Sequence, residues 1–229
     1  MSVIISQRFD GLGLQDPSRT YRLGIMGGTF DPIHIGHLAC AEQVRDKLNL
    51  DAVLFVVAGN PVYKKGQHVT SARHRIAMCK QAIANNDAFD VSSIEVDREG
   101  DTFTVDTLRQ MRMHYPDNVE FYFITGADAA SHVADWKESA EVLKLAQVIA
   151  VTRPDCDVSE QALVRMESFD TLPFQYQEVT ALAISSSDIR ERIRKGYSVR
   201  YLTPQSVLDF IEEHGLYRAS YDDAAFGEA

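Results

Sequence analysis

Short apolar runs alternate with longer amphipathic segments along most of this chain, and no other feature of the sequence constrains the fold as strongly. The apolar runs are typical of buried strands and lie at residues 21–26, 53–58, 119–125 and 147–152. Segments 36–48 and 104–114 are typical of helices, the first with its apolar residues on one stripe. Strands separated by helices predict an α/β fold, a doubly wound Rossmann-like parallel sheet with helices on both faces.

The remaining elements follow from weaker patterns. Residues 89–96 and 175–179 are predicted strands. Further helices are predicted at 71–84, 128–145, 186–194 and 204–214, with Ser71 as a cap and an interruption near Asp135 and Trp136. The last two helices would form a small C-terminal helical part. We therefore expect one domain over residues 21–218, a flexible leader at 1–20 and a flexible tail at 219–229.

A sheet of this kind also predicts where a ligand binds. Doubly wound sheets bind ligands beyond the carboxyl ends of their strands. The segments that follow Met26, Ala58, Thr125 and Thr152 should therefore line the site.

Composition excludes several functional classes. The net charge is −10, which argues against a protein that coats nucleic acid. No apolar run approaches the ~20 residues needed to span a bilayer, so no membrane association is expected. Cys40, Cys79 and Cys156 form no C-x-x-C pair, which argues against a zinc site or a disulfide framework. No signal peptide is recognisable, and we predict a cytoplasmic protein.

The segment GGTFDPIHIGHL, residues 27–38, carries the most chemistry. Gly27 and Gly28 permit close approach of the backbone to a ligand, and Gly36 does so at the start of the next helix. A helix N-terminus attracts phosphate. His34 and His37 are three residues apart, so both imidazoles can project to one side and donate hydrogen bonds to phosphate oxygens. Together these features predict a phosphate site.

A second segment, ISSSDIRERI at residues 184–193, points to the same chemistry. Its serines offer hydroxyl and N–H groups at a helix start, and Arg190 lies one turn later. The planar fork of an arginine binds two phosphate oxygens at once. Arg190 also opens a basic cluster that extends to Arg200 in an otherwise acidic chain, which permits binding of small anions.

Both segments resemble signatures of one protein family. The H-I-G-H core is similar to the signature of the nucleotidyltransferase superfamily, and the whole first segment resembles the nicotinate mononucleotide adenylyltransferases. The second resembles their I-S-S-T-x-I-R motif, with Ser187 in place of threonine. The resemblance runs in order from Leu23 to Tyr217. It implies transfer of AMP from ATP to nicotinate mononucleotide, giving nicotinate adenine dinucleotide and pyrophosphate, with Mg²⁺ accompanying ATP.

The resemblance also implies individual roles. The implied catalytic residues are His34, His37 and Arg190. The implied ATP-binding residues are Gly27, Gly28, Thr29, His37, Gly126, Asp128, Arg153, Ser186, Ser187 and Arg190. The implied mononucleotide-binding residues are Phe30, Asp31, Lys64, Arg75, Thr104 and Trp136, with Trp136 stacked on the pyridine ring. Whether Lys64 or Lys65 reaches phosphate is open, and no metal-ligating residue is assigned.

Two other functions share these signatures. A phosphopantetheine adenylyltransferase has the same motifs, but lacks the G-x-D segment and tryptophan at the spacing of Gly126, Asp128 and Trp136. A non-catalytic nucleotide sensor is expected to lose a signature histidine or arginine, and this chain keeps all three. The preference for nicotinate over nicotinamide mononucleotide rests on the resemblance alone. Association into a homo-oligomer is left open.

Overall fold

The computed structural model describes residues 6–11, 14, 16–60, 69–152, 174–180 and 182–218. In this part of the chain one parallel sheet has six strands in the order β3-β2-β1-β4-β5-β6. The strands are β1 (Tyr21–Gly28), β2 (Ala52–Val57), β3 (Phe89–Ser92), β4 (Val119–Gly126), β5 (Gln147–Thr152) and β6 (Phe174–Glu178). The predicted doubly wound fold is confirmed. Because the strand order reverses between β1 and β4, the sheet has its switch point there.

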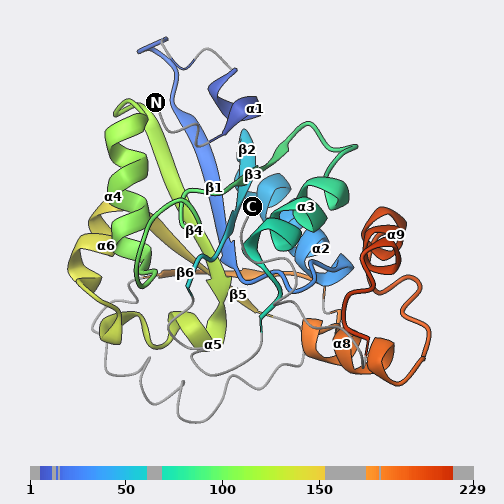
Figure 1. Ribbon diagram of the computed structural model, residues 1–229. Coiled ribbons are helices and arrows are strands. Elements are labelled where there is room, and N and C mark those ends of the chain that lie inside the picture. Colours follow the sequence, from blue (N-terminus) through green and yellow to red (C-terminus); the bar gives the residue numbers. More distant parts are fainter. Residues whose placement is uncertain are drawn as a thin grey trace.

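Helices cover both faces of the sheet (Figure 1). One face carries α4 (Thr104–His114) and α6 (Ser139–Leu145), and the other carries α2 (Ile35–Leu48), α3 (Ala72–Ala82) and α9 (Gln205–Glu213). Two helices, α5 (Ala127–Ala130) and α8 (Ser186–Arg194), lie at the end of the sheet toward which β1 and β4 point. That end therefore holds the carboxyl ends of the strands.

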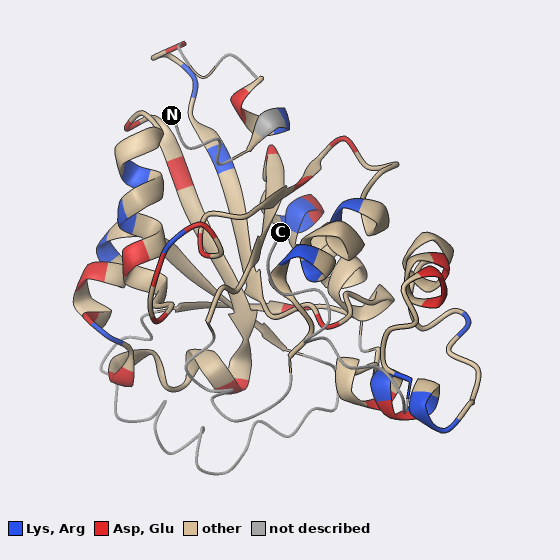
Figure 2. Ribbon diagram, viewed as in Figure 1, with Lys and Arg blue, Asp and Glu red and all other residues tan. Residues whose placement is uncertain are grey.

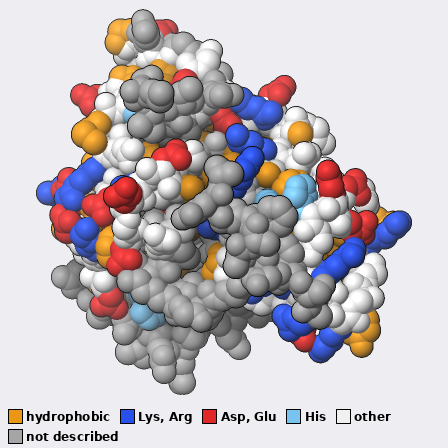
Figure 3. Space-filling view, in the orientation of Figure 1, with side chains coloured by type: hydrophobic (Ala, Val, Ile, Leu, Met, Phe, Trp, Pro, Cys, Tyr) orange, Lys and Arg blue, Asp and Glu red, His pale blue; other side chains and the backbone are white. Residues whose placement is uncertain are grey.

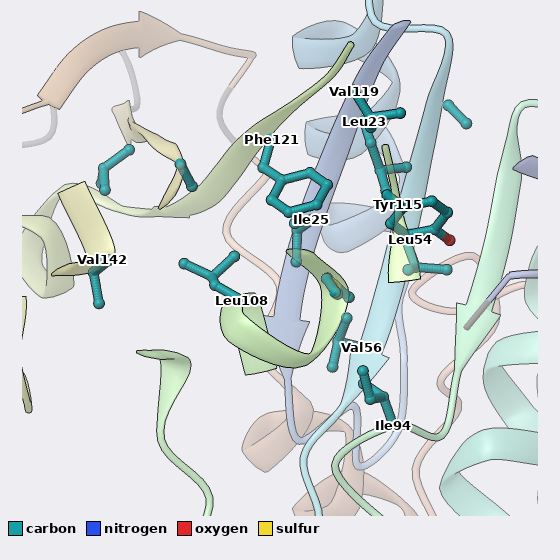
Figure 4. Close-up of a cluster of buried hydrophobic side chains, with 14 of the residues drawn as sticks. Leu23, Ile25, Leu54, Val56, Ile94, Leu108, Tyr115, Val119, Phe121 and Val142 are labelled. Atoms are coloured by element: carbon teal, nitrogen blue, oxygen red, sulfur yellow. The ribbon is translucent and has the colours of Figure 1, made fainter. Parts of the chain in front are cut away.

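The core has two halves, one on each face of the sheet. Side chains of the strands alternate between them, as the pleat requires. Leu23 and Ile25 of β1, with Leu54 of β2, face α4 and pack near its Leu108 (Figure 4). Neighbours in β2 such as Phe55 point the other way, toward α2 and α3. Strands buried on both faces explain why the sequence shows continuous apolar runs.

The structure confirms most predicted elements, with several bounds changed. The predicted bounds of α4, β5 and α8 agree with the structure. The predicted strand at 89–96 ends at Ser92, whose hydroxyl accepts the Ile94 N–H at 3.3 Å and turns the chain. The predicted helix at 128–145 consists of α5, the 3₁₀ helix η2 (Val133–Asp135) and α6. It is interrupted because Trp136 is extended and Glu138 has a left-handed φ of 51°.

Residues before β1 differ from the expected flexible leader. A short helix, α1 (Gln7–Asp10), packs at the β3 edge of the sheet. The Ser6 hydroxyl donates to the Asp90 carboxylate of β3 at 2.7 Å, and the Phe9 side chain is 1% exposed in the core. The Phe9 side chain is therefore part of the fold. The tail at 219–229 lies outside the described residues.

Charged residues of both signs occur in helices on both sides of the sheet (Figure 2). On the face seen in Figure 3, basic and acidic groups are mixed and the visible hydrophobic side chains are scattered among them. Within the described ranges, no helix has the length and apolar character needed to cross a membrane. The basic residues of α8 are mostly paired locally, Arg192 with Asp188 at 2.7 Å and Lys195 with Glu191 at 3.0 Å.

The packing of α1 gives a test of stability. Replacing Phe9 by alanine should lower the free energy of unfolding by about 3 kcal/mol, because a buried aromatic ring is lost from the core. Urea unfolding of Phe9→Ala and the parent measures this difference. The control is Met113→Ala, since Met113 is 82% exposed and its loss should change little. An unchanged unfolding midpoint for Phe9→Ala would show that α1 contributes nothing to stability.

Candidate active site

Two cavities open at the carboxyl ends of β1 and β4. The first has a volume of about 470 Å³ and contains His34 and His37, and we call it the histidine cavity. The second has a volume of about 610 Å³ and contains Trp136, and we call it the tryptophan cavity. Both are lined by Gly27 and Thr125, so they meet at the switch point of the sheet. Two adjoining cavities suit two ligands that react at their boundary.

The two signature histidines form a reciprocal cap at the start of α2. The His37 N–H donates to Nδ1 of His34, and the His34 N–H donates to Nδ1 of His37, both at 3.3 Å. The rings stack with centroids 3.6 Å apart. Because both Nδ1 atoms accept, each neutral ring carries its proton on Nε2. Two Nε2–H donors in one cavity are suited to phosphate oxygens.

Burial keeps His37 neutral in the free protein. Desolvation, followed by repulsion from His34, lowers the pKa of His37 to about 3. Phe30 contributes to this burial, since its ring packs edge-on against His37 with centroids 5.1 Å apart. At neutral pH the His37 imidazole is therefore a hydrogen-bond donor without a charge.

Gly36 is required by the histidine pair. A Cβ atom at this position would lie 3.1 Å from two ring atoms of His34. Gly36 also lines the histidine cavity in the first turn of α2, where backbone N–H groups have no carbonyl partner within the helix. Glycine thus leaves room for the His34 ring and exposes the helix start to a ligand.

Helix α8 places the second signature segment, residues 184–193, in contact with the first, residues 27–38. The Ser186 hydroxyl donates to the Pro32 carbonyl at 2.9 Å, and Arg190 Nη1 donates to the Asp31 carbonyl at 2.6 Å. Ser186 and Ser187 line the histidine cavity, and Arg190 also donates to the Ser187 hydroxyl at 3.3 Å. Arg190 itself lines neither cavity, and it approaches the histidine cavity through its contact with Ser187.

The tryptophan cavity combines aromatic walls with a helix start. Trp136 packs edge-on against Phe123 of β4, with ring centroids 5.7 Å apart. Thr104 opens α4, whose N-cap residue Phe103 makes no side-chain capping bond. Lys137 lies over the Phe103 ring, 4.5 Å from its centroid. A flat ring bearing an anionic group fits this combination.

The structure separates the predicted site residues into groups. Those that line the histidine cavity are Gly27, His34, His37, Gly126, Ser186 and Ser187. Those that line the tryptophan cavity are Gly27, Gly28, Thr29, Thr104 and Trp136. The resemblance assigned Gly28 and Thr29 to ATP, but both residues line the tryptophan cavity and not the histidine cavity. Asp128 is exposed on α5 and lines neither cavity, while Lys64, Lys65 and Arg153 lie outside the described residues.

Arg75 is directed at the backbone and away from both cavities. Its side chain is 2% exposed. It donates to the carbonyls of Thr70, Thr29 and Ala58 at 2.8, 2.9 and 2.8 Å. These carbonyls belong to the segments that follow β1 and β2 and precede α3. In this structure Arg75 therefore holds together the loops that form the site.

Asp31 is likewise buried, with 3% of its surface exposed. Its carboxylate accepts the Tyr217 hydroxyl at 2.7 Å and the Thr70 N–H at 3.3 Å. Burial, followed by repulsion from Asp31, raises the pKa of Tyr217 well above its usual value. Tyr217, near the end of the described chain, thus helps to fix the conformation of the loop that carries the first signature. Sequence reasoning missed this role.

Sequence reasoning did not assign several other residues that line the cavities. The tryptophan cavity includes Glu95, Thr107, His132, Asp135 and Lys137, and the histidine cavity includes Cys40, Thr180 and Leu182. Glu95 lies nine positions before Thr104 in the sequence, and this proximity to an implied site residue was a signal that could have found it.

Comparison with known proteins agrees with this geometry. A family model described as cytidylyltransferase-like matches residues 25–192. A Thermoanaerobacter protein named probable nicotinate-nucleotide adenylyltransferase is 45% identical, over 87% of this chain and 96% of its own length. A protein of the same name from Desulfitobacterium hafniense is 47% identical, over 86% and 96%. A solved structure of Plasmodium falciparum nicotinic acid mononucleotide adenylyltransferase complexed with NaAD aligns with a TM-score of 0.66 at 22% identity, covering 86% of this chain and 97% of that one.

The contacts of Arg75 predict a structural role. Arg75→Lys should lower the free energy of unfolding by about 3 kcal/mol, because a lysine leaves buried carbonyls without donors. The KM for the mononucleotide should stay close to that of the parent. Arg73→Lys, an exposed substitution on the same helix, is the control for both measurements. A raised KM with unchanged stability would instead support the substrate contact implied by the resemblance.

The neutral state of His37 predicts a dependence of stability on pH. Between about pH 6 and pH 4 an unfolded chain protonates His37, whereas the folded chain, with a pKa of about 3, does not. The free energy of unfolding should therefore fall by up to about 1.4 kcal/mol per unit as pH decreases, and recover toward pH 7.

Urea unfolding at several pH values tests this dependence. The free energy of unfolding of His37→Gln should depend less steeply on pH than that of the parent, because the contribution of about one proton is lost. His114→Gln is the control, because His114 lies outside both cavities and its loss leaves the His37 contribution in place. Equal slopes for the parent and His37→Gln would contradict the buried neutral imidazole.

Proposed function

The chain belongs to the nicotinate-nucleotide adenylyltransferase family, within the cytidylyltransferase-like proteins, and we propose that the two adjoining cavities bind the two substrates of its reaction. The reaction transfers AMP from ATP to nicotinate mononucleotide and releases pyrophosphate. The observation that supports this assignment is the meeting of the cavities at Gly27 and Thr125, where both substrates reach one point. The residue roles below are part of the proposal.

The histidine cavity is the proposed site of ATP. Its donors are the Nε2–H groups of His34 and His37, the start of α2 and the hydroxyls of Ser186 and Ser187. These groups are suited to a triphosphate. The same cavity contains apolar side chains suited to a purine base, namely Val151, Val179, Leu182 and Ile184. Arg190 joins the phosphate end through its contact with Ser187.

The tryptophan cavity is the proposed site of the mononucleotide. Trp136 offers its face to the pyridine ring. The start of α4 at Thr104 and the nearby ammonium of Lys137 favour the ring carboxylate of the nicotinate form. The 5′-phosphate would then lie toward Gly27 and Gly28, next to the α-phosphorus of ATP.

The proposed chemistry is a direct in-line displacement. An oxygen of the mononucleotide 5′-phosphate forms a bond to the α-phosphorus, and the bond from that phosphorus to the bridging oxygen of pyrophosphate breaks. Such transfers depend on positioning and on stabilisation of charge. His34, His37 and Arg190 stabilise the negative charge that grows on the phosphates. No covalent enzyme intermediate is part of this mechanism.

Magnesium enters this proposal as part of the substrate, Mg–ATP. The described side chains that line the histidine cavity include hydroxyls but no carboxylate. In the described part of the chain no group of three or more metal-binding side chains gathers at one place. This donor set suits a cation held by phosphate oxygens and water. The predicted cytoplasmic location and any homo-oligomer stay predictions.

The role of the histidines is tested by pyrophosphate release from Mg–ATP and nicotinate mononucleotide. His37→Ala should reduce kcat about 100-fold or more, since one charge-stabilising donor is lost. His114→Ala, outside both cavities, should keep parental activity. Full activity of His37→Ala would remove the histidine from the mechanism. Phosphopantetheine offered as an alternative acceptor should give no pyrophosphate.

A further inference from the structure

One acidic residue of the tryptophan cavity has no role in the reaction described above. Glu95 follows β3 and lines the cavity, with 8% of its surface exposed. The segment after β2 closes over it, since a Cβ atom at Gly59 would lie 2.3 Å from the Glu95 carbonyl oxygen. A buried carboxyl group therefore forms part of the wall of a site that is proposed to receive another carboxylate.

The bonding of Glu95 leaves its charge only partly compensated. Its Oε1 accepts the Thr107 hydroxyl of α4 at 2.7 Å. Arg98 donates to that same hydroxyl oxygen at 3.1 Å and to Gln110 at 3.3 Å. The hydrogen bonds of Arg98 thus connect its guanidinium to the Glu95 carboxyl group through Thr107. Among the described residues no salt bridge includes Glu95.

The surroundings favour a protonated Glu95 near neutral pH. Burial raises the pKa of Glu95 to about 7, against the opposing effects of the Thr107 hydrogen bond and the attraction of Arg98. The other titratable groups that line the cavity are His132, Asp135 and Lys137. Asp106 of α4 binds the Lys137 ammonium at 3.0 Å, which reduces the positive charge on this side.

Substrate binding should add to this effect. A nicotinate ring brings its own carboxylate into the cavity, and two carboxylates that share a poorly solvated site repel each other. A protonated Glu95 has no such repulsion, and its hydroxyl is a donor. The nicotinamide ring carries a neutral amide, so its binding does not oppose ionisation of Glu95.

We propose that Glu95 is a specificity-determining residue whose protonated form admits the nicotinate ring and whose ionised form reduces the preference for the acid over the amide. This proposal rests on the proposed function, which assigns the tryptophan cavity to the mononucleotide. It links substrate selectivity to pH through one buried carboxyl group. Glu95 acts on binding and takes no part in the bonds that form and break.

The experiment compares kcat/KM for nicotinate and nicotinamide mononucleotides between pH 6 and pH 9. Both substrates share the 5′-phosphate and ATP, so the ratio of the two values cancels the titration of those groups. For the parent this ratio should fall at least about 10-fold above neutral pH. For Glu95→Gln the ratio should be independent of pH. Quenching of the single tryptophan by each mononucleotide without ATP gives the same comparison for binding alone.

Two further variants complete the design. Glu99→Gln, an exposed neighbour, should show the parental fall in the ratio. Thr107→Val removes the hydrogen bond that favours the ionised form, so the fall should move to higher pH. Thr107→Val also tests the proposal if Glu95→Gln does not fold. A fall that persists unchanged in Glu95→Gln, or a midpoint that does not move in Thr107→Val, would overturn the proposal.

The parent alone also decides between the two proposals. A ratio that is flat with pH, in an enzyme that turns over nicotinate mononucleotide, would overturn the role of Glu95 and leave the proposed function intact. Absence of pyrophosphate release from both mononucleotides at every pH would instead overturn the proposed function.

Discussion

The hydrogen bonds between α8 and the backbone of Asp31 and Pro32 are the contacts on which the active site depends. They join segments 159 and 154 residues apart in sequence, through the Arg190 guanidinium and the Ser186 hydroxyl. Without them the first signature would have a helix start and two imidazoles, but no serine hydroxyls and no guanidinium. Arg75 and Tyr217 also donate hydrogen bonds to this loop, at the Thr29 carbonyl and the Asp31 carboxylate. Several elements therefore fix its conformation.

The candidate active site has few exposed charges, although ATP is a polyanion. A chain with a net charge of −10 would not attract ATP through its overall field. The histidine cavity compensates with neutral donors, because His37 is uncharged and the serines and helix starts contribute partial charges only. Such groups are already oriented in the fold, so little reorganisation accompanies the growth of charge in the transition state. Burial thus lowers the pKa of His37 on one side of the switch point and raises the pKa of Glu95 on the other.

Local patterns were sufficient for most elements, and they were insufficient where tertiary contacts compete. The segment 104–114 was predicted as a helix, and α4 forms with the same bounds. The segment 128–145 was predicted as a helix with an interruption near Asp135 and Trp136, and the extended Trp136 divides it there. Trp136 instead packs against Phe123 and lines the cavity. Phe9 shows the converse case, since it lies between polar residues in a segment predicted as a flexible leader, and yet it is buried in the core.

The sequence by itself determined the doubly wound sheet, the edge of the sheet that carries the site, and the phosphate-directed chemistry of the two signatures. These follow from periodicity and from residue types, which are local properties. Only the tertiary structure decided that Gly28 and Thr29 line the tryptophan cavity and that the Arg75 guanidinium bonds to backbone carbonyls. It also decided that Glu95 is buried in the cavity wall. Solvation and hydrogen-bond partners depend on which distant segments meet, and that information is absent from any short stretch of the chain.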